Sequence, residues 1–440
     1  MRPHPHVFSA LRSELYDWRL WTGRGVVLAF AALAGLTVVA FTWLTEHALT
    51  YFSVFQKSWW WGPLLWTPAS TAAIVWITRR HAPGAAGSGI PQVMAALTPE
   101  VPPGSRSLFV SLKLTFAKIS LTAWGLLAGL SLGREGPSVQ IAAGVMHHAR
   151  RWLPSRARVS EHGLLLAGGA AGIAAAFNTP LGGVMFAIEE LTRTPEQRSN
   201  GLLLSAIVLG GLMAVSVYGN ATYFGVIRVE NLSLGLLLPG LLVAVCSGAA
   251  GGLFARLLVV STAGKSLDWF SRFRQRYPIR FAAACGLAVA ILGLASQGAT
   301  YGSGYAHTRD ILDGSGESSP FYVVLKFLAT WITAWSGVPG GIFAPALAIG
   351  GALGNDIAQL TAYANAPTLI ALGMAGFLAA VTQAPLTAFI IVMEMVDGHA
   401  LVLSLMASAL VASGVSRLIS APLYASLAAL QLQRLPPDKK

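Results

Sequence analysis

Residues 133–144 read GREGPSVQIAAG, which places an arginine and a glutamate inside a region of small and apolar residues. Proline is favoured in the first turn of a helix, where its missing N–H costs nothing, and a preceding glycine permits a tight entry loop. The stretch therefore predicts a helix that begins close to Pro137. Its entry is formed by Gly133, Arg134, Glu135 and Gly136.

The composition indicates a polytopic helical membrane protein. Hydrophobic residues make up 54% of the 440 residues and charged residues only 11%, about half the charged fraction of a soluble domain. Several apolar runs approach the roughly 20 residues that a helix needs to cross the hydrocarbon. The clearest runs are 26–43, 62–78, 120–132, 203–217, 232–255, 281–295 and 401–415.

The net charge of +12 comes from cations that lie between and beside these runs, including four arginines within residues 272–280. By the positive-inside rule, this distribution predicts cytoplasmic termini and a cytoplasmic loop at 265–280. It gives no reason to expect nucleic acid as a partner. The polar, basic N-terminus lacks the apolar core of a signal peptide.

Two halves of the chain carry the same signatures. GREGPSVQIAAG resembles GIFAPALAIGGA at an offset of 208 residues (133 to 341), and residues 168–190 resemble 373–395 at an offset of 205 (168 to 373). The same order of matches in both halves predicts a duplicated unit. We divide the chain into an N-terminal segment 1–24, a first repeat 25–220, a connecting helix and basic loop 221–280, a second repeat 281–425 and a tail 426–440.

Three glycine–proline entries predict helices that begin inside the membrane: GSGIP at 87–91, GREGP at 133–137 and GGIFAP at 340–345. A helix that starts there presents unsatisfied N–H groups and the positive end of its dipole. Both features suit a small anion, and they supply no full lysine or arginine charge that would prevent release. Ordinary kinks would explain one such motif, but three of them favour an anion site.

Glu135 is a carboxylate at one of these helix starts, and an acid inside a membrane is a functional candidate. When ionised, it competes with an anion for the same N–H groups; when protonated, it leaves them. We therefore expect Glu135 to link anion movement to proton movement. A close pair with Arg134 is not expected, because adjacent residues do not face each other on a helix.

GSGIP, GREGP and GIFAP in this order, followed by Tyr424 of APLYASL, resemble the CLC family of chloride channels and chloride/proton exchangers. The resemblance runs from about residue 20 to Tyr424. It implies an all-α fold of tilted and broken helices in two inverted halves. It also implies a homodimer with one anion pathway per subunit.

The resemblance assigns roles by motif. It implies a chloride site formed by Ser88, Gly89, Ile90, Ile342, Phe343 and Tyr424. The resemblance implies that the ion is bound by the hydroxyls of Ser88 and Tyr424. It also implies binding by the N–H groups of Ile342 and Phe343. Glu135 resembles the gating glutamate and external proton acceptor. A proline at 88 would indicate nitrate instead of chloride.

Glu190, the second acid of FNTPLGGVMFAIEELTR, resembles the internal proton acceptor of the family's exchangers. Its presence favours coupled chloride/proton exchange over a passive chloride channel, which is the first alternative. A fluoride/proton antiporter is a more distant alternative. Another is a membrane hydrolase using Ser88 or Ser303 with His307 and Asp310, although no motif positions such a triad.

The remaining expectations concern the fold and the partners. Two acids and two lysines lie at matching positions of the two repeats and are interpreted as structural residues: Glu189 with Glu394, and Lys118 with Lys326. Cys246 and Cys285 are expected to be buried thiols. We expect a protein of the bacterial inner membrane that is not an enzyme. It would use no cofactor, metal or ATP, and would bind chloride and protons as substrates.

Overall fold

The structure is a computed structural model and describes residues 18–154, 159–192, 201–219, 222–227, 234–264, 268–316 and 319–433. Within these ranges it is helical throughout, apart from one isolated antiparallel bridge between Gly133 and Gly341. This confirms the all-α prediction. Among the described residues, six helical segments are long and apolar enough to cross a membrane: Leu20–Ser58, Gly104–Leu127, Gly201–Tyr218, Leu237–Ala263, Pro278–Ala295 and His399–Arg417.

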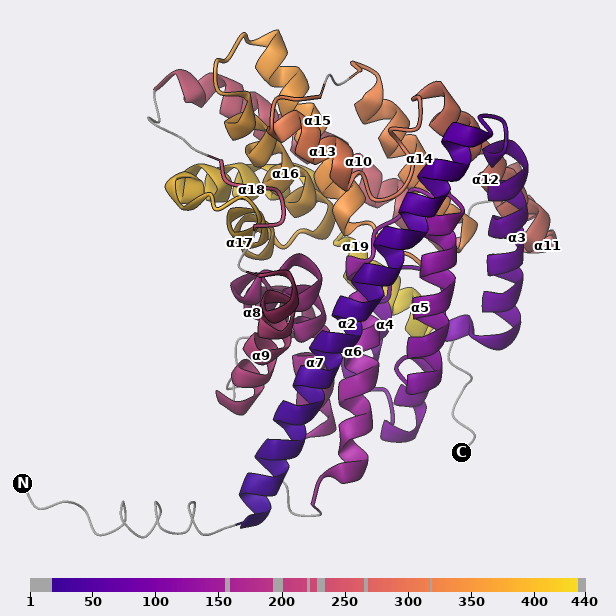
Figure 1. Cartoon of the computed structure of the whole chain (residues 1–440), viewed down its shortest axis with the longest axis vertical. Coiled ribbons are helices and arrows are strands. Elements are labelled where there is room, and N and C mark those ends of the chain that lie inside the picture. The colour runs from indigo at the N-terminus through magenta and orange to yellow at the C-terminus, as the bar shows by residue number, and fades with distance from the viewer. Residues whose placement is uncertain are drawn as a thin grey trace, which may run out of the picture.

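The part of the first half that the structure describes contains eight α-helices, arranged around a central pair, α6 and α7. The helices are α2 (Trp18–Ser58), α3 (Pro63–His81), α4 (Ile90–Leu97), α5 (Leu112–Leu127), α6 (Glu135–His148), α7 (Glu161–Phe177), α8 (Pro180–Phe186) and α9 (Gly201–Tyr218). The long helix α2 runs diagonally along this half and packs against α6, α7 and α9 (Figure 1). A π-helical turn, η4 (Ala187–Thr192), continues α8.

The second half repeats this arrangement around α15 and α16. Its helices are α10 (Leu237–Ala263), α11 (Trp269–Arg276), α12 (Pro278–Ala295), α13 (Tyr305–Leu312), α14 (Tyr322–Ser336), α15 (Phe343–Leu360), α16 (Ala366–Thr382), α17 (Pro385–Met395), α18 (Val402–Arg417) and α19 (Leu423–Leu432). Helix α10 packs against α15, α16 and α18, as α2 packs in the first half. We therefore propose that the second repeat starts at α10 and not at residue 281.

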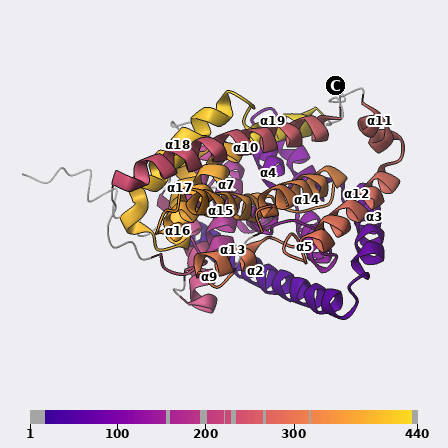
Figure 2. The ribbon, with the colours of Figure 1, turned by 90° about the horizontal axis from the view of Figure 1, so that it is seen from above.

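Small residues allow the central helices to approach closely. A side chain added at Gly350 of α15 would collide with the carbonyl of Gly373 in α16, so the two backbones are in contact. Such packing replaces the hydrophobic driving force that helices lack in lipid. The last helix, α19, leaves its own half and packs against α4 of the first half, and Figure 2 shows both beside α10.

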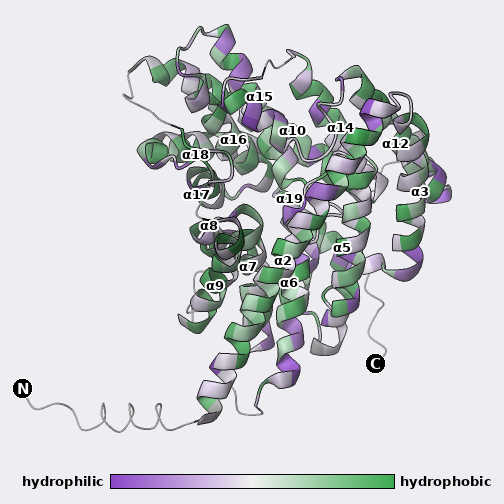
Figure 3. Cartoon of the chain, in the orientation of Figure 1, coloured by the Kyte–Doolittle hydropathy of each residue, from purple (hydrophilic) through white to green (hydrophobic). Residues whose placement is uncertain are grey.

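Many large apolar side chains are exposed on the outside of the molecule, and Figure 3 shows hydrophobic residues along most of its helices. This explains one wrong prediction: Cys285 is buried, but Cys246 is exposed on α10 beside the exposed Leu242 and Val245. An apolar run in a membrane protein does not distinguish a residue that faces the core from one that faces lipid, because both surroundings are apolar.

Three boundaries also differ from the sequence prediction. Helix α2 begins at Trp18, ahead of Arg24, whose guanidinium lies 5.1 Å from the ring centroid of Trp21. The basic loop contains a helix, α11, because the Asp268 carboxylate accepts from the N–H of Ser271 and caps it. Residues 426–432 belong to α19 and not to a tail, whereas most of segment 1–24 and residues 434–440 lie outside the described residues.

Candidate functional site

Backbone hydrogen bonds join the entry loops of the two halves. The N–H of Gly133 donates to the carbonyl of Gly341 at 2.7 Å, and the N–H of Gly341 donates back to Gly133 at the same distance. The N–H of Gly340 donates to the carbonyl of Gly87 at 3.1 Å. The helices that follow these loops, α4, α6 and α15, therefore begin close together, as the three motifs predicted.

Glycine is required where these loops touch. Gly89 has a φ of +110°, and a Cβ there would lie 2.7 Å from the carbonyl oxygen of Gly136. A Cβ at Gly136 would collide with the hydroxyl oxygen of Ser88. Any larger residue would therefore separate the first motif from the second. Ile90 follows directly as the fully buried first residue of α4.

Two buried hydroxyls face this region from opposite halves. Tyr424, at the start of α19, is fully buried, and neither its hydroxyl nor that of Ser88 has a hydrogen-bond partner among the described residues. Both residues line one cavity of about 110 Å³, together with Ile342. Because an unsatisfied buried donor is costly, the pair indicates a place for a ligand that accepts hydrogen bonds.

The ring of Tyr424 is held in place by the second half of the molecule. It stacks on Phe343, the first residue of α15, with the ring centroids 6.0 Å apart and the planes 14° from parallel. Phe343 in turn contacts Phe186 at the end of α8, with the centroids 6.3 Å apart. The phenol ring is thus fixed against the first residue of α15, and it lines the same cavity as Ile342.

Glu135 occupies the start of α15. Its side chain is fully buried, and one carboxylate oxygen accepts from the N–H of Ala344 at 3.4 Å. The other carboxylate oxygen has no hydrogen-bond partner among the residues that the structure describes. The carboxylate therefore lies where the helix presents its N-terminal donors, which is the position that an anion would compete for.

Arg134 points away from this carboxylate. Its guanidinium donates to Glu46 at 2.8 Å and to the hydroxyl of Tyr223 at 3.1 Å. This agrees with the expectation that Arg134 and Glu135 are not a close pair. No sequence motif marks Glu46 or Tyr223; the one local signal is that Glu46 is the single acidic residue in α2.

Glu190 is fully buried on the π-helical turn η4. This turn packs against α4 and α7, so it lies beside the helix that follows Ser88. Single π-helical turns are rare and occur frequently at functional sites. On this turn Glu190 is buried, while the neighbouring Glu189 accepts from the N–H groups at the start of α17.

Glu189 and Glu394 cap each other's neighbouring helices. The carboxylate of Glu189 accepts from the N–H groups of Leu386 and Thr387 at 3.1 and 2.6 Å, at the start of α17. Glu394 accepts from Leu181 and Gly182 at 3.2 and 2.7 Å, at the start of α8. These reciprocal caps give both residues the structural role that their repetition indicated.

The two buried lysines have matching roles. The ammonium of Lys118 donates to the carbonyls of Ala85 and Gly87 at 2.7 and 2.8 Å, in the loop before Ser88. That of Lys326 donates to Thr300 and Gly302 at 2.9 and 2.8 Å. Each lysine fixes an entry loop, so neither charge is directed at the site.

An ion-pair cluster lies at the opposite end of α6. The carboxylate of Glu161 accepts from Arg106 at 3.1 Å and from Arg150 at 2.6 Å, and it contacts a ring nitrogen of His147 at 2.5 Å. Burial alone would raise the pKa of Glu161, but these partners outweigh burial, so its pKa lies below the ordinary value. The cluster ties the end of α6 to the start of α7.

The chain matches a family and a set of known proteins along most of its length. Residues 69–417 match the family described as "Voltage gated chloride channel". The H(+)/Cl(-) exchange transporter ClcA of Citrobacter koseri is 32% identical over 391 residues, which cover 84% of this chain and 80% of that protein. ClcA of Klebsiella pneumoniae is 31% identical over 420 residues, covering 90% and 86%.

Solved structures agree with this match. A slow cyanobacterial Cl-/H+ antiporter has a TM-score of 0.78 and 26% identity, covering 93% of this chain and 98% of its own. A CLC-type fluoride/proton antiporter has a TM-score of 0.74 at 22% identity, covering 91% and 96%, a likeness that concerns the fold alone.

Proposed function

The chain belongs to the voltage-gated chloride channel family, the CLC family, and on that premise we propose that it exchanges chloride for protons across a membrane. The observation that carries the proposal is the buried Glu135 carboxylate at the start of α15. It lies at a helix start beside two buried hydroxyls that have no partner among the described residues. The names of the ClcA relatives and of the cyanobacterial antiporter support the same activity.

Chloride would bind in the cavity between Ser88 and Tyr424. Their hydroxyls would donate to the ion, and the N–H groups of Ile342 and Phe343 would replace part of its hydration shell. Because Arg134, Lys118 and Lys326 are engaged elsewhere, neutral donors and helix dipoles would contact the ion. Among the described residues that line the cavity, Arg274 is the one cation. Such a site binds a halide without trapping it, as transport requires.

Glu135 would couple this ion to a proton. When ionised, its carboxylate takes the N-terminal donors of α15 and blocks the anion path. When protonated, it loses its attraction to those donors and yields the place to chloride. Each exchange of carboxylate for chloride at this point therefore moves one proton with the side chain.

Glu190 would supply the proton from the other side. It is buried beside α4 and is not among the residues that line the anion cavity. A route through Glu190 would therefore keep protons apart from chloride until both reach Glu135. A passive chloride channel would need no such second acid, which makes it the weaker candidate.

We further propose a homodimer in the bacterial inner membrane, with both termini in the cytoplasm and no cofactor. Helices α8, α9, α17 and α18 form one edge of the molecule and suit a second copy (Figure 1). This edge exposes large apolar side chains: Leu181, Ile188, Leu212, Leu386, Leu403 and Leu410.

The decisive test is coupled flux in liposomes that contain the purified protein. A chloride gradient should drive protons uphill, and a proton gradient should drive chloride. Chloride flux with no proton movement under either gradient would instead identify a passive channel.

A further inference from the structure

A second cavity of about 590 Å³ lies at the ends of α3, α10 and α14, beside α11. Its volume falls within the range of small-molecule binding sites. Among the described residues that line it, none is acidic. Its polar lining comprises Thr78, Arg79, Thr262, Ser271, Arg274, Gln275 and Ser336.

Two arginines from separate helices line this cavity. Arg79 is in the last turn of α3 and is exposed, whereas Arg274 lies on α11. The guanidinium of Arg274 donates to the carbonyl of Ser261 at 2.6 Å, and the neighbouring Gln275 amide donates to Gly264 at 2.6 Å. These bonds hold α11 against the end of α10, so the Arg274 guanidinium is positioned at the cavity wall.

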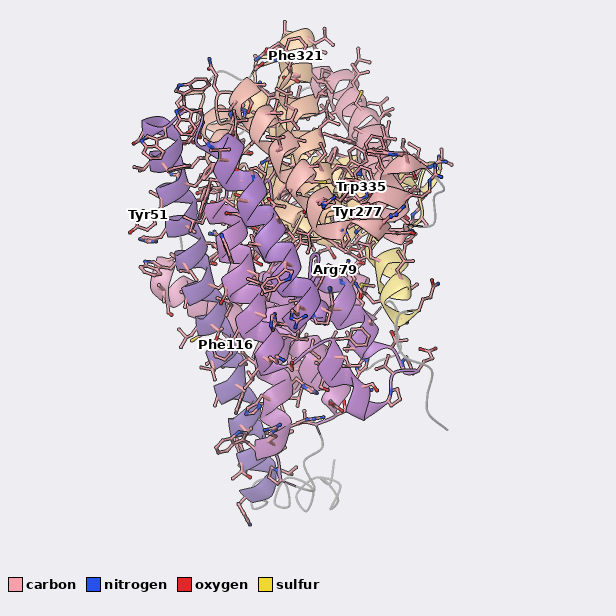
Figure 4. The ribbon with its side chains drawn as sticks, turned by 90° about the vertical axis from the view of Figure 1, so that its right-hand side faces the viewer. Tyr51, Arg79, Phe116, Tyr277, Phe321 and Trp335 are labelled. Carbon is pink, nitrogen blue, oxygen red and sulfur yellow. The ribbon has the colours of Figure 1, made fainter. Side chains whose placement is uncertain are left out.

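Helix α11 has the composition of a helix at a membrane surface. Trp269 and Phe270 are 62% and 54% exposed, and Arg272 and Arg276 are exposed as well. Aromatic and arginine side chains together are typical of the headgroup region. Figure 4 shows Tyr277, which follows α11, on the same side of the molecule as Arg79. The cavity therefore lies at the depth of lipid headgroups.

We propose that this cavity binds the headgroup of an anionic phospholipid whose phosphodiester carries hydroxyl groups. Arg79 and Arg274 would bind the phosphate oxygens, for which the guanidinium geometry is well suited. The hydroxyls would donate to the carbonyls at the ends of α3, α10 and α14, which carry partial negative charge. A choline headgroup has no such donors. Basic pockets between membrane helices bind anionic headgroups in this way.

The position of Arg274 connects this lipid site with the anion site. Arg274 also lines the smaller cavity that contains Ser88 and Tyr424. A bound phosphate would neutralise its charge and so reduce the local attraction for chloride. This consequence rests on the proposed function, but the lipid site itself does not.

The test measures lipid retention by native mass spectrometry on the purified full chain. Delipidated protein is incubated with phosphatidylglycerol or with phosphatidylcholine of the same chain length. The variant Arg79→Gln/Arg274→Gln is compared with Arg272→Gln/Arg276→Gln, which removes the same charge from exposed positions outside the cavity lining. We expect wild type and control to retain phosphatidylglycerol, and the cavity variant to lose roughly tenfold in affinity.

Three results would overturn the proposal. One is equal retention by the cavity variant and the wild type, and another is equal loss in the two double variants, which would indicate attraction by net charge alone. The third concerns competition for bound phosphatidylglycerol. If inorganic phosphate displaces this lipid as effectively as dihexanoyl phosphatidylglycerol does, the ligand is a soluble phosphate. If the double variant fails to fold, Arg79→Gln alone gives the same comparison, because the bond between Arg274 and Ser261 stays intact.

Discussion

Replacing Glu135 with alanine removes the side chain that we propose competes with chloride. The carboxylate accepts from the N–H of Ala344 at 3.4 Å, which is long for a hydrogen bond to a charged group. Such bonds contribute about 1.5–3 kcal/mol, and this length favours the lower end. Since about 1.4 kcal/mol corresponds to a factor of ten, Glu135→Ala should tighten chloride binding by roughly tenfold.

Isothermal titration calorimetry in detergent measures this affinity directly. Proton uptake in liposomes should disappear in the same variant, while chloride flux persists and no longer depends on pH. Glu100→Ala is the control, because Glu100 is an exposed carboxylate. Unchanged or weaker chloride binding in a folded Glu135→Ala protein would refute the competition.

Three further predictions test the other acids. Glu190→Gln should stop proton flux in liposomes but spare chloride flux; equal loss of both would exclude a dedicated proton acceptor. Glu189→Gln should lower thermal stability by about 1–2 kcal/mol, because it weakens the cap of α17, and an unchanged melting temperature would contradict that role. The low pKa of Glu161 means that its ionised form stabilises the fold. This stability is present at neutral pH and is lost below roughly pH 4, so melting temperatures should show a smaller acid-induced decrease in Glu161→Gln than in wild type.

Much of the site could be predicted from local sequence. Glycine and proline restrict the backbone directly, so GSGIP, GREGP and GIFAP each indicate a helix start without knowledge of the fold. The internal repeat indicated that Glu189 is a structural residue, because Glu394 lies at the matching position of the other half. The structure supplies the geometry of that symmetry, in which each acid caps the other half's helix.

Other features depend on contacts that no local pattern encodes. Glu46 meets Arg134 across 88 positions of the chain, and Tyr223 reaches the same guanidinium from a loop with no motif. The π-helical turn at Glu190 packs against α8, α4 and α7, and no sequence motif predicts it. The exposure of Cys246 was missed because apolar residues are equally stable against lipid and against protein.

The most direct test of the account is the location of bound bromide by anomalous scattering in soaked crystals. We expect a peak between the hydroxyls of Ser88 and Tyr424, near the N–H groups of Ile342 and Phe343. Crystals of Glu135→Gln should show a second peak beside the N–H of Ala344, where the carboxylate lies in the wild type. No bromide at either position in either crystal would contradict the central claim that converging helix starts bind an anion in competition with one carboxylate.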